Sequence, residues 1–250
     1  MKLNRVAIVL AVMSVAVTGC SSNTQAVTVG NAAKPSTSAA PVQTGSQRAL
    51  TADQIQKTLP TVDQVGTGWA LSESDKAAST PSPDATTFAP AECAFSAQGS
   101  DSVLGITKAD QKPQAEGQVT FKQGTDSPFD VNQTFVSIKS YADNVDTSGI
   151  VAAASKLAEC SKFTSTDSGG VTSSFELFPL SLPNYGDKTL AFRLQGGAGM
   201  FIIVGDVVGI VIGHNVITVA QFGLGKIDTE LAGRVATNVM ANLNTVTGTK

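Results

Sequence analysis

The stretch MFIIVGDVVGIVIGHNVITVAQF, residues 200–222, decides the fold of this chain. Between Met200 and Gly213 the sequence is dominated by Ile and Val, residue types that favour strands. His214 and Asn215 predict a tight reversal, because Asn tolerates positive φ. An apolar return strand follows at 216–222. The pattern predicts a β-hairpin near the centre of an antiparallel sheet.

The same stretch has about the length of a membrane-spanning helix, which is the alternative interpretation. Asp206, His214 and Asn215 lie inside it, and such groups are costly within a bilayer. Its β-branched residues and glycines also favour strands over a helix. We therefore expect the hairpin.

Outward from the hairpin, hydrophobic periodicity predicts the other elements of the domain. Alternation predicts strands at 118–123, 134–138, 172–178 and 189–195, and helical spacing predicts helices at 52–59, 148–162 and 228–243. Thr51 and Gln54 form a capping-box pattern at the first helix. Helices and strands do not alternate strictly, so we expect a single α+β domain. Its antiparallel sheet would have five or six strands, with helices packed on one face.

The N-terminus predicts export. Lys2 and Arg5 precede an apolar run at 6–17, and Val17-Thr18-Gly19-Cys20 follows. This arrangement resembles a bacterial lipobox, in which the cysteine is acylated and becomes the new N-terminus. An ordinary secretory signal with an incidental cysteine is the alternative. We expect a signal peptide at 1–19, a lipidated and disordered tether at 20–48, and the folded domain at 49–247. The protein would then be anchored by lipid on the extracytoplasmic face of the cell membrane.

The remaining cysteines predict one disulfide. Once Cys20 is lipidated, Cys93 and Cys160 are left, and they permit a single pairing in an oxidising compartment. Two free buried thiols are the alternative. Removal of Lys2 and Arg5 with the leader lowers the formal charge of the chain from −3 to −5, which argues against nucleic acid as a partner.

The sequence contains few groups that could support catalysis or metal binding. His214 is the single histidine, and its position at a predicted turn favours a structural role. One histidine and a disulfide pair cannot supply a zinc site. Gly196-Gly197-Ala198-Gly199 lacks the Gly-Lys-Ser/Thr of a phosphate loop, and a strand follows it. We expect no catalytic residues, no metal and no cofactor.

Four residues are candidates for a ligand site. Trp69 is the single tryptophan, and it could form the wall of a groove or part of the core. Gly205, Gly209 and Gly213 would share one face of a strand, and that smooth face would admit either a ligand or a packed helix.

The order of several motifs resembles a known group of proteins. After the lipobox come Gly66-Thr67-Gly68-Trp69, Pro90-Ala91-Glu92-Cys93, Ala158-Glu159-Cys160, Tyr185-Gly186-Asp187 and the amphipathic closing helix. This order is similar to that of actinobacterial lipoproteins with a domain like the extracellular sensor domain of PknH-type receptor kinases. The resemblance covers roughly residues 50–243. It implies a non-catalytic α+β domain with a cleft for an envelope ligand, although those kinase domains carry two disulfides.

Three functions follow as hypotheses. The first is a cell-envelope lipoprotein that binds a small molecule, a lipid or an envelope protein without catalysis. The second is a lipid carrier with an apolar cavity. The third, a hydrolase with an unusual Ser/Lys or Asp site, is supported only by the abundance of hydroxyl groups.

Overall fold

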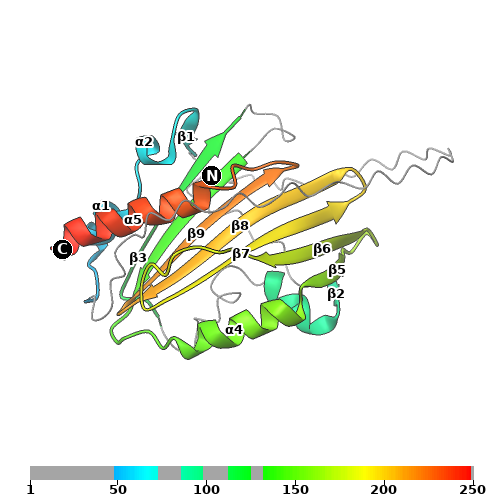
Figure 1. Cartoon of the computed structure of the whole chain (residues 1–250), viewed down its shortest axis with the longest axis horizontal. Helices are drawn as coiled ribbons and strands as arrows, with labels where there is room; N and C mark the ends of the chain where they lie inside the picture. Colours follow the sequence, from blue (N-terminus) through cyan, green and yellow to red (C-terminus); the bar gives the residue numbers. More distant parts are fainter. Residues whose placement is uncertain (1–47, 73–85, 98–111, 125–131, 249–250) are drawn as a thin grey trace, which may run out of the picture. The chain divides into compact units, whose positions relative to one another are not determined.

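Nine antiparallel strands form one sheet in the computed structural model, which describes residues 48–72, 86–97, 112–124 and 132–248. All of these residues belong to one compact unit, Ser38–Lys250. The strand order is β1-β3-β4-β9-β8-β7-β6-β5-β2 (Figure 1). The strands are β1 (Trp69–Leu71), β2 (Thr87–Ala89), β3 (Ala115–Gln123), β4 (Asn132–Ser140), β5 (Lys162–Thr166), β6 (Thr172–Pro179), β7 (Lys188–Ala198), β8 (Phe201–Ile212) and β9 (Asn215–Leu224).

The predicted hairpin at residues 200–222 is confirmed as β8 and β9, which lie near the middle of the sheet. Ile212 pairs with Asn215, so Gly213 and His214 form the turn. Gly213 has a φ of 57°, a conformation that glycine adopts without steric cost. At the other end of β8, Ala198 pairs with Phe201 across a second tight turn.

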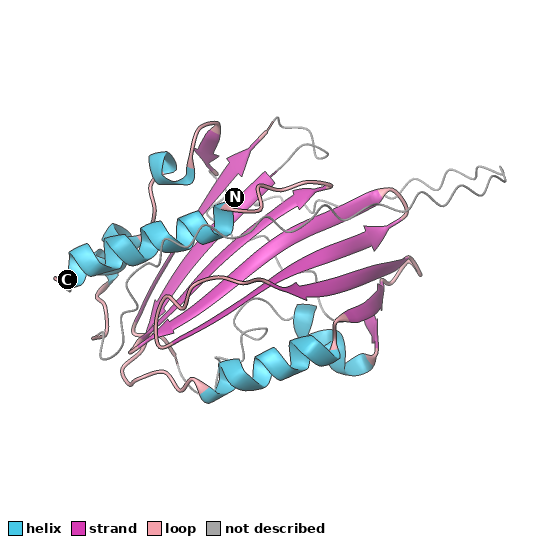
Figure 2. Ribbon diagram, in the orientation of Figure 1, coloured by secondary structure: helices cyan, strands magenta, loops and turns pink. Residues whose placement is uncertain are grey.

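The packing of the helices places them on both faces of the sheet. Figure 2 shows the helices and strands of the domain, with α5 lying across the central strands. They are α1 (Ala52–Thr58), α2 (Val62–Val65), α4 (Ser148–Glu159) and α5 (Leu231–Thr247), with a 3-10 helix η2 at Ala91–Ala97. The predicted capping box of α1 is confirmed, since Thr51 Oγ1 accepts from Gln54 N and Gln54 Oε1 accepts from Thr51 N.

One face of the sheet, here called the α5 face, is covered by α1, α2 and α5. The buried stripe of α5 packs with the even-numbered residues of β8 and the odd-numbered residues of β9, and the cluster includes Leu231, Val235, Val239, Leu243, Val208, Ile210, Ile217 and Val219. Burial of each such side chain stabilises the fold by about 1.5–3 kcal/mol. This layer is the main core.

The opposite face, here called the α4 face, is covered in part by α4. Ile150 packs with Val211 and Val216, and Leu157 lies in a cluster with Val207. The predicted disulfide is confirmed: Cys93 of η2 joins Cys160 at the C-terminus of α4 and closes a loop of 67 residues. It fixes η2 to the end of the helix.

The predicted fold class was wrong in two respects. The sheet has nine strands rather than five or six, because β1, β2 and β5 had no predicted counterpart. The helices also cover both faces rather than one, because α4 packs on the face opposite α5. The domain is therefore mostly β.

Other sequence predictions lie outside the described residues. The signal peptide, Cys20 and almost all of the tether fall there, and the boundaries of the folded domain stay a prediction. Among the helices that the structure describes, none has the length and apolar character needed to cross a membrane.

Candidate functional site

A row of small and polar side chains crosses the α4 face of the central strands. The strand register places Gln118 opposite Ser137, Ser137 opposite Thr218, and Thr218 opposite Gly209. We call these four residues the small-residue row. It crosses four neighbouring strands, a distance of about 15 Å at the usual strand spacing. Gly209, Thr218 and Ser137 have small side chains, whereas Gln118 at the outer end of the row has a longer polar one.

A partly open pocket of about 370 Å³ lies at the outer end of this row. It is lined by Glu116, Gly117, Gln118, Ser137, Ile138 and Lys139, which belong to β3 and β4. Glu116 and Lys139 are opposite each other in the strand register, in the pair next to Gln118 and Ser137 on the same face. The pocket therefore offers charged groups of both signs, an amide and a hydroxyl.

Thr218 gives this row an unmet hydrogen-bonding group. Its side chain is fully buried, and its Oγ1 has no hydrogen-bond partner. An unpaired buried hydroxyl costs about 1–3 kcal/mol, and such a group in a native protein often marks the place of a water or a ligand. Ser137, its neighbour across β4 and β9, reaches the pocket.

The α5 face carries a second polar row, which is buried and centred on an ion pair. Arg193, Asp206, Gln221 and Thr134 are successive cross-strand neighbours. Arg193 Nε and Nη2 donate to the two carboxylate oxygens of Asp206 at 2.6 and 2.8 Å. Both amide atoms of Gln221 and the hydroxyl of Thr134 are buried without partners. The hydrogen bond to Asp206 raises the pKa of the Arg193 guanidinium, so Arg193 stays charged.

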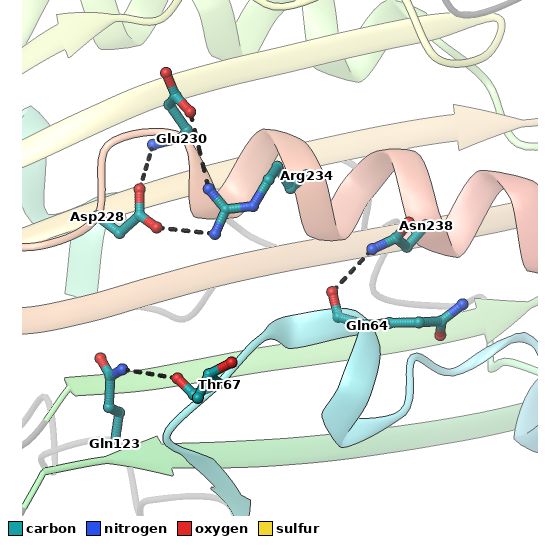
Figure 3. A network of polar contacts seen from close by, with 7 residues as sticks. All are labelled: Gln64, Thr67, Gln123, Asp228, Glu230, Arg234 and Asn238. Atoms are coloured by element: carbon teal, nitrogen blue, oxygen red, sulfur yellow. Dashed lines mark hydrogen bonds and ion pairs between the residues drawn. The ribbon is translucent and has the colours of Figure 1, made fainter.

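Polar contacts hold α5 against the elements beside it and close this face (Figure 3). Arg234 donates to Asp228 at 2.8 Å, and Asn238 Nδ2 donates to the carbonyl oxygen of Gln64 in α2 at 2.9 Å. The hydrogen bond from Arg234 lowers the pKa of the Asp228 carboxyl. The partly open pocket adjoins the small-residue row on the α4 face, so that row is the candidate site.

The structure separates the four predicted ligand-site residues. Trp69 lies on β1 in the α5-face core and is 9% exposed. Gly205 and Gly209 lie on the α4 face of β8, whereas Gly213 lies in the turn beyond that strand. At Gly205 a Cβ atom would meet the ring of Phe222, so this glycine accommodates a packed side chain. Gly209 alone belongs to the small-residue row, and a ligand role for these residues stays a prediction.

Sequence reasoning did not identify Glu116, Gln118, Ser137, Lys139 or Thr218. The one sequence pattern that could have pointed to them is the alternation of polar side chains along β3. The same alternation is typical of any strand with one face in solvent. His214 lies at the predicted turn, with Nδ1 3.2 Å from the carbonyl oxygen of Tyr141. Within the described residues, no group of three or more His, Cys, Asp or Glu side chains is placed to hold a metal ion.

Comparison with known proteins identifies a solved structure with a similar fold. No known family and no curated protein matches the sequence. The crystal structure of the extracellular domain of PknH from Mycobacterium tuberculosis matches with a TM-score of 0.58 at 14% identity, over 79% of this chain and 98% of that domain. The chain has the fold of the PknH extracellular domain. The predicted resemblance to PknH is thereby confirmed for the fold.

A second structure, that of an uncharacterized Mycobacterium smegmatis protein orthologous to Rv0999, matches with a TM-score of 0.41 at 15% identity, over 78% of this chain and 97% of that chain.

Proposed function

We propose that this chain is a lipid-anchored protein of the cell envelope, and that its extracytoplasmic domain binds a ligand without catalysis. The signal-peptide and lipobox pattern at Cys20 supports the anchor. The Cys93–Cys160 disulfide and the likeness to an extracellular domain support a location outside the cytoplasm. The observation that carries the binding role is the small-residue row, with its unpaired Thr218 hydroxyl beside the pocket on β3 and β4.

The chemistry of the pocket favours a polar ligand. Gln118 and Ser137 line it with an amide and a hydroxyl, and Glu116 and Lys139 flank them. The Thr218 hydroxyl belongs to the residue opposite Ser137 on β9. Such groups suit a ligand with hydroxyl and amide groups, for example a fragment of cell-wall glycan or peptide. Because the pocket is only partly enclosed and has charged side chains in its lining, a lipid carrier, which needs an enclosed apolar cavity, is the less favoured alternative.

Replacement of Thr218 by Val tests the binding role. Valine has nearly the same shape but no hydroxyl, so removal of an unpaired buried group should leave the free energy of unfolding unchanged or raise it by about 1 kcal/mol. Full-length protein would be screened by thermal unfolding against soluble fragments of cell-wall glycan and peptide. A fragment that stabilises the native protein should lose most of its effect with Thr218→Val.

The matched control is Thr134→Val on the α5 face. Thr134 is also fully buried and its hydroxyl is also unpaired, so its replacement should change stability in the same direction. Fragment binding should remain. A fragment that stabilises the native protein and Thr218→Val equally would contradict the proposed site.

The anchor is tested separately. Native protein should partition with membranes and carry acyl chains on Cys20, as mass spectrometry would show. Cys20→Ser should be neither acylated nor processed at that position. An unacylated native chain would refute the lipid anchor and leave the binding role to be decided by the Thr218 variant.

A further inference from the structure

The turn between β7 and β8 exposes four consecutive large apolar side chains. Met200 is 88% exposed, Phe201 52%, Ile202 43% and Ile203 40%. We call these four residues the β7–β8 tip. Other exposed large apolar residues, such as Leu71 on β1 and Val151 on α4, lie on separate elements. Single exposed apolar residues are ordinary on protein surfaces, whereas a contiguous group marks a binding surface.

The tip is apolar on both sides of the sheet. Phe201 and Ile203 belong to the α4 face of β8, Ile202 belongs to the α5 face, and Met200 occupies the turn. A protein partner that covered one face would leave the other in water. Hydrocarbon can surround a narrow wedge from all sides, so the geometry favours a lipid environment over a single protein surface.

The charge pattern agrees with this environment. Residues 194–205 contain no charged side chain. The flanking Arg193 and Asp206 neutralise each other in the ion pair described above. Lys226 is exposed just after Gly225, whose N–H donates to the carbonyl oxygen of Ile202. A cation at this place suits the headgroup layer, with the apolar tip below it.

The backbone of the tip is suited to an apolar medium. Ladder pairing joins Ala198 to Phe201 and Ile203 to Leu224, and the carbonyl oxygen of Ile202 accepts at 2.8 Å. Strands with paired backbone groups avoid the cost of unsatisfied N–H and C=O groups in hydrocarbon. The open turn itself would lie at the interface with the acyl chains.

The chain outside the folded core is long enough to let the tip reach the membrane. The carbonyl oxygen of Arg48 accepts from Asn215 Nδ2, so the tether joins the domain at the end of β8 opposite the tip. β8 spans about 40 Å at the usual rise per residue. The segment from Cys20 to Arg48 has a maximum length of about 95 Å, which exceeds that span.

We propose that the β7–β8 tip inserts into the boundary between headgroups and acyl chains of the membrane that carries the anchor. The domain would then have two membrane attachments, at opposite ends of β8. This inference goes beyond ligand binding, and it relies on the proposed lipid anchor only to bring the domain close to a membrane.

Tryptophan scanning in vesicles tests the insertion. Full-length Met200→Trp protein would be reconstituted into vesicles of phosphatidylethanolamine and phosphatidylglycerol, with or without brominated acyl chains. The signal of native protein, which comes from buried Trp69, would be subtracted. Insertion predicts at least twofold quenching by brominated lipid and protection from aqueous iodide. Val151→Trp is the matched control, because Val151 is 52% exposed on α4, and it should show the reverse pattern.

Each other outcome counts against the proposal. Iodide quenching of Met200→Trp equal to that of Val151→Trp would place the tip in water. Protection from iodide without quenching by brominated lipid would indicate a protein contact instead. Flotation separates the two proposals: a chain that does not float with the vesicles refutes both the anchor and the insertion, whereas a floating chain with an unquenched Met200→Trp refutes the insertion alone.

Discussion

The ion pair between Arg193 and Asp206 predicts an asymmetry between its two halves. Asp206 is fully buried and accepts both hydrogen bonds from one guanidinium, whereas the Arg193 side chain is 22% exposed. In Arg193→Met the carboxylate would remain buried without its counter-ion. In Asp206→Asn the guanidinium would remain, and its partial exposure lets it recover solvation from water. The first variant should therefore be the less stable.

The size of the effect follows from the burial. Removal of one partner of a buried pair typically costs about 3–5 kcal/mol, and we expect Arg193→Met to fall in this range. Asp206→Asn should cost about 1.5–3 kcal/mol, the value of a hydrogen bond to a charged group. For a domain of this size, the cost of about 3–5 kcal/mol expected for Arg193→Met corresponds to a fall in Tm of about 6–20 °C. The double variant Arg193→Met/Asp206→Leu should lie closer to the native protein than Arg193→Met alone.

Chemical denaturation followed by circular dichroism would measure these differences as a double-mutant cycle. Gln221→Leu is the control, because both amide atoms of Gln221 are unpaired and their removal should be neutral or stabilising. A cost of less than about 1 kcal/mol for Arg193→Met, which is close to the precision of such measurements, would refute the reasoning. A larger cost for Asp206→Asn than for Arg193→Met would also refute it.

Three further predictions concern stability. Asp228→Ala should destabilise the protein by about 0.5–1 kcal/mol, because Asp228 is half exposed and binds both Arg234 and the start of α5. The folded state lowers the pKa of the Asp228 carboxyl. The stability that Asp228 contributes is therefore present above the pKa of this carboxyl in the unfolded chain, and it is lost as the pH falls through the pKa in the folded protein. Unfolding curves measured over a pH series should show this loss in the native protein and not in Asp228→Ala. Replacement of Cys93 and Cys160 by Ala should cost up to about 4 kcal/mol in the chain-entropy treatment of a 67-residue loop, measured by denaturation with and without reductant. Gly196→Ala should lower Tm by several degrees, because the added methyl would meet the backbone of β6; a Tm equal to that of the native protein would contradict the packing.

Sequence patterns predicted those parts of the fold that have local causes. The hairpin of β8 and β9, the capping box of α1 and the stripe of α5 each depend on neighbouring residues. β1 and β2 are three residues long, too short for an alternating pattern to be recognised. β5 begins at Lys162, where the helical pattern of the preceding segment was extended too far. These omissions explain the wrong strand count.

The placement of helices and of the candidate site depends on tertiary structure. A helical pattern identifies the buried stripe of α4 but not the face of the sheet that it covers. The small-residue row becomes visible only when the register aligns Ser137 with Thr218 and Gln118. Trp69 was a reasonable candidate for a groove, yet its large apolar surface is buried in the core.

The short outermost strands have a consequence for association between copies of the protein. A long free edge invites pairing with the edge of a neighbouring molecule, and repeated pairing of this kind builds fibres. Here the wide sheet ends on both sides in strands of three residues, at Trp69–Leu71 and Thr87–Ala89. Each of these outermost strands offers a neighbouring copy only three residues of backbone, so neither is a good template for continuous pairing between copies.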